Sequence, residues 1–183
     1  MPEPSERRSL ALVVAIVAVM TAVTTVFTIV VRIPIPGTVG YVLLTDVAVY
    51  FTAFAMGPFS AAIAGGVGSA LGDVWLGGAI WAPNSLLAHG LQGLAAGLVA
   101  GLARAGDPTG RKRSVPLLWI LGALLGGVIM VGMYILGGLL IEGPVTLRGV
   151  PWNAAQATFG AVFGAAFAQV VRRAYPPVRD LRW

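Results

Sequence analysis

Long apolar stretches alternate with short polar segments along the whole chain, and these stretches determine the expected fold. A helix that crosses a bilayer needs about 20 mostly apolar residues. Prolines, glycines or charges interrupt the pattern between the stretches. The pattern therefore predicts an all-α integral membrane protein, formed by one domain that covers residues 1–183. We expect its six transmembrane helices at residues 10–31, 43–56, 58–75, 83–103, 115–141 and 152–171.

The second and third of these helices could instead be one kinked helix, because only Gly57-Pro58 separates them. The basic residues decide between the two, since cytoplasmic segments carry the excess of lysine and arginine. With six helices, ten of the twelve basic residues lie on one side, whereas a single kinked helix would misplace nine. We therefore predict two short helices, and cytoplasmic N- and C-termini. The ten are Arg7, Arg8, Arg104, Arg111, Lys112, Arg113, Arg172, Arg173, Arg179 and Arg182; the exceptions are Arg32 and Arg148.

The composition agrees with a lipid environment. Hydrophobic residues make up 57% of the chain and charged residues 10%, whereas a soluble domain usually has about 25% charged residues. The net charge of +5 does not indicate a nucleic-acid partner, because the basic residues flank apolar runs instead of lining one face. Anionic lipid headgroups are the simpler partner. The absence of cysteine excludes disulfides, thiolate metal sites and a cysteine nucleophile.

The sequence holds no motif that indicates an enzyme. Residues 106–114 resemble a phosphate-binding loop, but three residues instead of four separate the glycines, and Arg111 stands in the lysine position. Ser85 and His89 have the spacing of a nucleophile and a base, but no third group and no nucleophile elbow accompany them. We therefore expect no catalysis, no cofactor and no metal, and an energy source outside this chain.

Small residues form ridges on several of the expected helices. Membrane helices associate through such residues, which allow close backbone contact. Glycine ridges, such as the one in the fourth helix, are typical of packing within one chain. The stripe on the first helix indicates a surface for a partner subunit instead. It consists of Ala11, Ala15, Ala18 and Ala22.

Polar and aromatic residues gather at the expected outer ends of the helices. Polar groups inside a membrane are costly and tend to mark a functional cavity. In the fourth helix they share one face, opposite the glycines, at about 100° per residue. Amide, imidazole, carboxyl and aromatic groups together suit a flat, polar, heterocyclic ligand. The candidate substrate-binding residues are Tyr41, Asp46, Trp75, Trp81, Asn84, His89, Gln92, Asn153 and Gln156.

Each candidate also has a purely structural interpretation. Outer tryptophans anchor many membrane proteins at the interface. Asp46 could cap the second helix, Asp73 could bond backbone amides at a helix end, and Tyr41 could be a surface residue. His89 could bond Ser85, one turn earlier. The gathering of these residues on one side favours the functional interpretation for the group, without deciding it for each member.

Several stretches together resemble the substrate-binding S component of energy-coupling factor (ECF) transporters. The resemblance covers nearly the whole chain, and its motifs lie between about residues 10 and 103. The alanine-rich first helix and the six-helix layout also match. The stretches are GYVLLTD at 40–46, MGP at 56–58, GSALGDVWLG at 68–77, WAPN at 81–84 and HGLQGLAAG at 89–97.

This resemblance implies a vitamin-binding subunit in the plasma membrane of a prokaryote. Such a subunit assembles with a transmembrane T component and two cytoplasmic ATPase subunits. The alanine stripe would contact the T component, the first outer loop at 33–44 would cover the ligand, and the site would lie near the outer ends of helices four to six.

Three hypotheses for function follow. The first is the S component of an importer for a vitamin or vitamin precursor. A neutral ring compound of the pyrimidine, pyridine or flavin type is expected, because the site has no basic cluster. The second is a membrane structural or assembly subunit without a small-molecule ligand. The third is a small transporter that works without partner ATPases.

Overall fold

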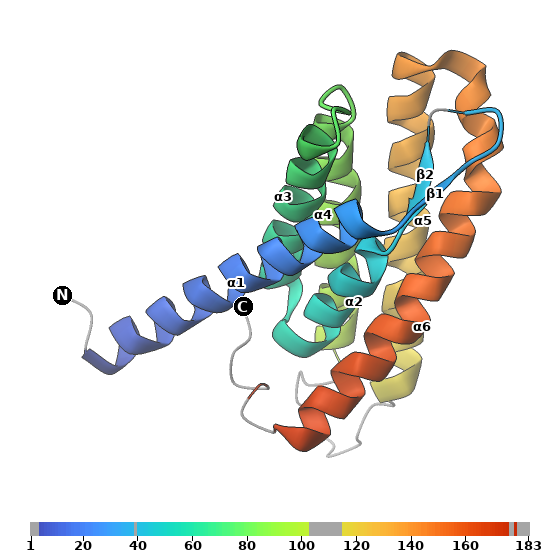
Figure 1. Cartoon of the computed structure of the whole chain (residues 1–183). Coiled ribbons are helices and arrows are strands. Elements are labelled where there is room, and N and C mark those ends of the chain that lie inside the picture. The colour runs from blue at the N-terminus through green and yellow to red at the C-terminus, as the bar shows by residue number, and fades with distance from the viewer. Residues whose placement is uncertain (1–3, 39, 103–114, 176–177, 179–183) are drawn as a thin grey trace.

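The computed structural model describes residues 4–38, 40–102, 115–175 and 178, and these form an all-helical protein with one short hairpin (Figure 1). The linker at 104–114 and the basic tail residues Arg179 and Arg182 lie outside the described residues. The elements are α1 (Pro4–Val30), β1 (Arg32–Pro34), β2 (Tyr41–Leu43), α2 (Thr45–Met56), α3 (Pro58–Trp75), α4 (Ala82–Gly101), α5 (Val115–Ile141), the 3-10 helix η1 (Gly143–Gly149) and α6 (Val150–Ala174).

By length and composition, three of the described helical segments could cross a membrane: Leu10–Val30, Leu117–Ile141 and Gly143–Ala174. The helix Thr45–Met56 is apolar but shorter. The all-helical class and the presence of long apolar helices are thus confirmed. The number of spans and the side of the termini remain predictions.

Gly57 and Pro58 separate α2 from α3, as the sequence predicts. Gly57 has a φ of 98°, a conformation that side chains disfavour, and Pro58 begins the next helix. The backbone therefore turns between two short helices instead of continuing through a kink. α2 is the most enclosed helix, because every one of its residues except Phe51 is buried.

The segment between α1 and α2 forms a hairpin that the sequence pattern did not predict. β1 and β2 are antiparallel, and Ile33 pairs with Val42 at the centre of the register. The turn uses Gly37, whose φ is 74°. The Arg32 guanidinium lies over the Tyr41 ring at 5.3 Å, which adds a cation–π contact across the strands. The expected loop at 33–44 is therefore partly ordered as a sheet.

Glycines bring the backbones of α3 and α4 together. A Cβ added at Gly93 would lie 2.8 Å from the Ala61 carbonyl oxygen, and one at Gly97 would lie 2.5 Å from the Pro58 Cα. On α6, Gly160 and Gly164 likewise face the backbone of α2. The prediction that glycine ridges serve packing within the chain is confirmed at these positions.

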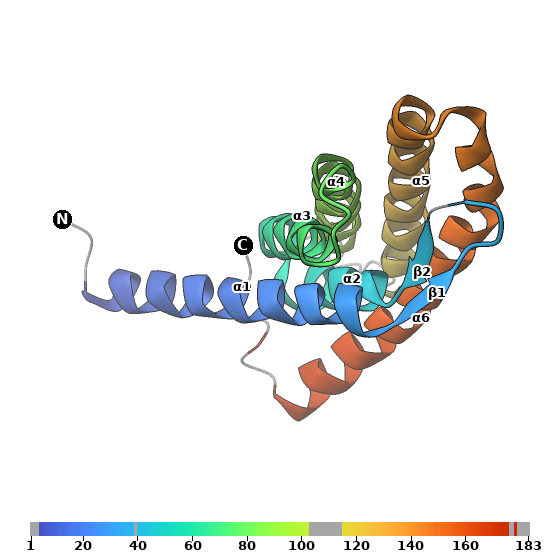
Figure 2. The ribbon, with the colours of Figure 1, turned by 45° about the horizontal axis from the view of Figure 1, so that its top comes forward.

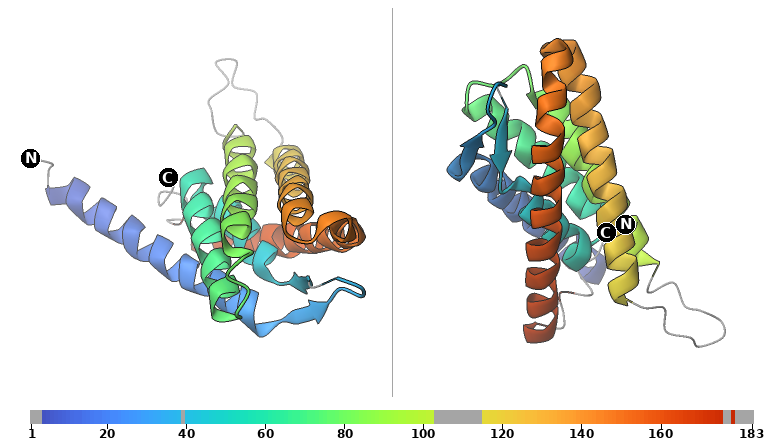
Figure 3. Two further views of the ribbon diagram at one scale, coloured as in Figure 1. Left: turned by 90° about the horizontal axis from the view of Figure 1, so that it is seen from above. Right: turned by 90° about the vertical axis from the view of Figure 1, so that its right-hand side faces the viewer.

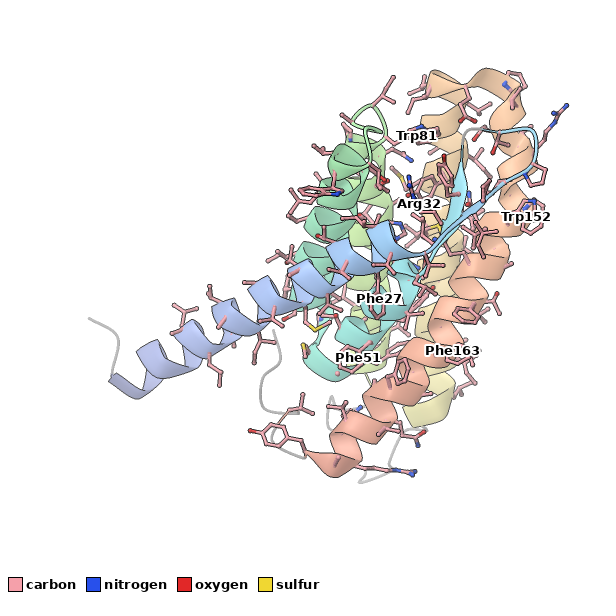
Figure 4. All side chains as sticks on the ribbon, viewed as in Figure 1. Phe27, Arg32, Phe51, Trp81, Trp152 and Phe163 are labelled. Atoms are coloured by element: carbon pink, nitrogen blue, oxygen red, sulfur yellow. The ribbon has the colours of Figure 1, made fainter. Side chains whose placement is uncertain are left out.

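The helices differ in how closely they join the bundle. Figures 2 and 3 show α2 at the centre, with α3 and α4 side by side and α6 along the other flank. The N-terminal half of α1 extends away from the other helices in Figures 1 and 2 and in the left view of Figure 3. In the stick view, Trp81 lies toward the upper end of the bundle and Phe51 toward the lower end (Figure 4). The polar site described next occupies the interior between α2, α4, α5 and α6.

Candidate functional site

One face of α4 is polar and buried, as the sequence predicts. His89 and Gln92 are fully buried, and Ser85 and Asn84 nearly so. The opposite face carries the glycines that pack on α3. The polar face does not point into an open space, because its side chains bond to one another and to residues of α2 and α5.

Asp46 is the centre of this polar interior. Its side chain is 0% exposed. The side-chain amide of Gln92 donates to Asp46 Oδ1, and that of Gln156 donates to Asp46 Oδ2. Only the NH2 end of an amide can face a carboxylate, so Asp46 fixes the orientation of both glutamines. Three helices, α2, α4 and α6, therefore meet at one carboxylate.

The suggestion that Asp46 caps α2 is wrong. The residue at the N-cap position is Leu44, and no side chain forms a cap bond there. Asp46 lies within the first turn, and both carboxylate oxygens are directed to glutamines on other helices. Gly160 makes this possible, since any side chain at that position would overlap Asp46.

Gln156 also fixes the hairpin to the site. Its Oε1 accepts a hydrogen bond from the backbone N–H of Leu43 at 2.6 Å. The end of β2 and the carboxylate of Asp46 are thus held by opposite ends of one amide group. A movement of the hairpin away from α6 must break this bond.

His89 bonds to Gln92 and Tyr134, so the suggestion of a direct bond to Ser85 is wrong. His89 Nδ1 lies 2.8 Å from Gln92 Oε1, and His89 Nε2 lies 3.2 Å from the Tyr134 hydroxyl. Because Gln92 Oε1 can only accept, the Nδ1 atom must carry a proton. Ser85 Oγ lies 2.8 Å from the same Tyr134 hydroxyl. Tyr134, on α5, therefore joins Ser85 to His89.

Three buried polar atoms at the same end lack a hydrogen-bond partner among the described residues: Asp73 Oδ2, Asn84 Nδ2 and Glu142 Oε1. The Asn84 side chain is 8% exposed and lies against Gly137 of α5. Asp73 is half-buried in the last turn of α3. The idea that Asp73 only bonds backbone amides does not account for its unpartnered oxygen. An acceptor and a donor are thus available to a ligand.

The remaining candidates lie around this interior or outside it. The Trp81 ring is half-buried, with its centroid 6.2 Å from that of Tyr134. Asn153 is half-buried, three residues before Gln156. Tyr41 is exposed beside Arg32, and Trp75 is 78% exposed. The structure therefore brings Asp46, Asn84, His89, Gln92 and Gln156 together, with Trp81 at their edge, and leaves Tyr41 and Trp75 on the surface.

The alanine stripe lies on the free side of α1. Ala11, Ala15, Ala18 and Ala22 are all exposed. The buried face of the helix holds Val13, Met20, Thr24 and Thr28, of which the threonines meet Gly68 and Gly72 of α3. This surface is therefore not used for packing among the residues that the structure describes.

Hydrogen-bonding groups of this kind are able to orient a polar molecule. Within the described residues, no three His, Asp or Glu side chains are grouped so that they could hold a metal ion. Asp46, Gln92, Gln156 and His89 are held by bonds to one another and to their neighbours, and the unpartnered Asp73 Oδ2 and Asn84 Nδ2 lie at the same end. Such groups orient a ligand in an otherwise apolar site.

Comparison with known proteins gives three findings. The family model of the ECF-type riboflavin transporter S component matches residues 10–173. A protein of Pyrococcus woesei, described as uncharacterized and located in the gap 3′ region, is 32% identical over 84% of this chain and 97% of its own length. The thiamine precursor transporter HmpT of Lactococcus lactis subsp. cremoris is 33% identical over 76% of this chain and 75% of its own length.

Proposed function

The chain belongs to the family of S components of ECF-type riboflavin transporters, and from this premise we propose that it captures a vitamin or vitamin precursor for an ATP-driven importer. The chain supplies the substrate site. A transmembrane T component and two cytoplasmic ATPase subunits complete the importer, in the plasma membrane of a prokaryote. With the six spans and cytoplasmic termini that the sequence predicts, the polar interior would lie toward the outside.

The observation that carries this proposal is the bonded set around Asp46. Burying a carboxylate, an imidazole and two amides inside a membrane protein is costly, and such groups usually mark a functional site. A subunit that only assembles with others has no need of them at this depth. The unpartnered Asp73 Oδ2 and Asn84 Nδ2 add hydrogen-bonding capacity that a substrate would satisfy.

The proposed substrate is a neutral ring compound of the pyrimidine, pyridine or flavin type. Such rings carry both donors and acceptors at their edge, which matches the mixture of carboxylate, amide and imidazole groups. Arg32 and Arg148 are the only basic residues expected on the outer side, so a strongly anionic substrate fits poorly. The transport of a thiamine precursor by the relative HmpT supports a small ring compound.

We propose a set of ligand contacts that this geometry supports. Asn84 and His89 would contact the ligand directly, together with Trp81 at the edge. Asp46, Gln92 and Gln156 would either contact it or hold the contacting groups in place. Tyr41, Trp75 and Asn153 stay candidates that a conformational change of the hairpin would have to bring inward.

The first experiment is native mass spectrometry of the gently purified chain, followed by identification of any released compound. A stoichiometric vitamin-like molecule is the expected result and would name the substrate. An empty protein that also shows no thermal shift with riboflavin, pyrimidine and pyridine vitamins would support the structural subunit instead.

A pair of variants separates substrate binding from stability. Asn84→Ala removes a donor that has no partner among the described residues, so it should weaken substrate binding without lowering the melting temperature. Ser60→Ala is the matched control, because Ser60 Oγ is also buried and unpartnered but lies at the far end of α3. Equal uptake by the two variants would favour a subunit that binds no small molecule.

A further inference from the structure

A large apolar groove runs between α5 and α6, away from the polar interior. Its volume is about 1180 Å3. None of the residues that surround Asp46 or His89 lines it. Phe54 and Trp119 lie at its lower part, while Val128 and Val162 form exposed walls. The groove therefore needs an occupant that is separate from the proposed vitamin.

The facing sides of the two helices carry small residues and approach closely at Gly127, where an added Cβ would lie 3.4 Å from the Ala157 Cβ, but a groove stays open along them. Ala123 and Gly127 of α5, and Ala161 and Ala165 of α6, line the groove. Small residues usually allow membrane helices to pack closely. Here they widen a groove instead, and an empty groove would lose the dispersion contacts of its walls. An acyl chain of a lipid is the available apolar filler in a bilayer.

One end of the groove is basic. Arg172 and Arg173, in the last turn of α6, line it together with Gln169. The Arg172 guanidinium lies 5.2 Å from the centroid of the Trp119 ring. Trp119 in turn stacks on Phe54, with centroids 4.7 Å apart and planes inclined by 7°. The basic end is thus built on a stack of rings that continues into the bundle.

We propose that this groove binds one anionic phospholipid. The acyl chain lies along the small residues of α5 and α6, and the phosphate contacts Arg173 and Gln169 beside the Arg172–Trp119 stack. The distribution of basic residues predicts that this end faces the cytoplasm. Anionic lipids are concentrated in that leaflet, and basic pockets between helices on that side recognise their headgroups.

The test uses Trp119 as a reporter within the full-length chain. The protein is reconstituted in phosphatidylcholine bilayers that contain a small fraction of acyl-brominated lipid, either phosphatidylglycerol or phosphatidylcholine. Bromine quenches the fluorescence of a tryptophan that it touches. We expect phosphatidylglycerol to occupy the groove about fivefold more favourably, the effect of one basic residue near the membrane surface. Trp119→Phe should abolish the difference, which assigns the signal to the groove.

Matched variants test the two parts of the site. Arg173→Gln should remove the preference for phosphatidylglycerol, whereas Arg148→Gln, which removes an exposed charge from η1, should keep it. Ala166→Phe fills the groove from an exposed position and should remove the preference, whereas Ala155→Phe, exposed on the same helix but outside the groove, should not. Val128→Phe fills the groove from α5 if Ala166→Phe does not fold.

Four results would overturn the proposal. Equal quenching by the two lipids in the unmodified chain would show that the groove does not bind phosphatidylglycerol specifically. This result is expected if a partner helix fills the groove. A preference that survives Arg173→Gln would exclude the phosphate contact. A preference that survives both groove-filling variants would place the lipid on the outer surface. Loss of the preference on adding soluble glycerol phosphate would indicate a site for free phosphate groups.

Discussion

Leu43 and Gln156 are joined by a 2.6 Å hydrogen bond across 113 residues of sequence. The bond runs from the backbone of β2 to a side chain of α6, whose other end donates to Asp46. The position of the hairpin and the orientation of the buried carboxylate therefore depend on the same amide group. If the hairpin covers the substrate, its opening and closing must be coupled to the groups around Asp46.

Gln156→Ala should loosen the hairpin and weaken the site together. The change leaves the Leu43 N–H and Asp46 Oδ2 without partners, and each unsatisfied buried group costs about 1–3 kcal/mol. Hydrogen exchange at the Leu43 amide should become faster, and the melting temperature should fall. Ala155→Ser, at an exposed position on the same helix, should change neither. Unchanged exchange at Leu43 in Gln156→Ala would contradict the coupling.

Asp46→Asn should destabilise the protein more than Asp73→Asn does. In Asp46→Asn, the new NH2 group faces an NH2 group of Gln92 or Gln156, and the lost bond and repulsion cost about 1–3 kcal/mol. In Asp73→Asn, no hydrogen bond is lost at the Oδ2 position, because Asp73 Oδ2 has no partner among the described residues. Thermal unfolding of both variants in the same detergent measures the difference. Equal melting temperatures would mean that the two amides do not stabilise Asp46.

Gly97→Ala should destabilise the α3–α4 contact, and Gly101→Ala should not. A Cβ at Gly97 would lie 2.5 Å from the Pro58 Cα and 2.7 Å from its nitrogen, and this backbone cannot move aside cheaply. We expect a loss of about 1–3 kcal/mol in the free energy of unfolding. No atom outside the local helix backbone lies within 4 Å of a Cβ at Gly101, so the better helix propensity of alanine should be neutral or favourable. A stable Gly97→Ala variant would show that α3 and α4 are farther apart.

The helices could be predicted from the sequence because apolar length and helix-breaking residues act locally. Gly57-Pro58 separated α2 from α3 as expected. The helices α1 and α6 extend beyond the predicted spans, because a helix can continue past the apolar segment that a bilayer covers. α1 therefore begins at Pro4 and includes the charged residues before position 10, and α6 continues to Ala174 through two arginines.

The polar face of α4 could also be predicted, because helical periodicity alone places Asn84, Ser85, His89 and Gln92 together. The pairing of Asp46 with Gln92 and Gln156 could not, since it depends on how three distant helices pack. Tyr134 was missed because a tyrosine in a long apolar helix has no periodic signal. The sequence offers one signal for Tyr134: it carries the only side-chain hydroxyl within residues 117–141. The hairpin was missed because strands of three residues, one with a proline, are too short to show alternation.

The alanine stripe gives the prediction that tests the proposed partners most directly. Ala15→Leu and Ala18→Leu together should prevent co-purification with the T component and ATPase subunits, because bulky side chains keep helix backbones apart. Both positions are exposed and face away from the buried side of α1. Folding and substrate binding by the isolated chain should therefore be unchanged.

Ala155→Leu, at an exposed position on α6, is the control for adding an apolar side chain to the lipid-facing surface, and it should assemble normally. If the double variant still co-purifies with its partners at the level of this control, the stripe on α1 is not the interface. If it also loses the substrate, α1 positions the binding site, and the separation of an assembly surface from a capture site does not hold.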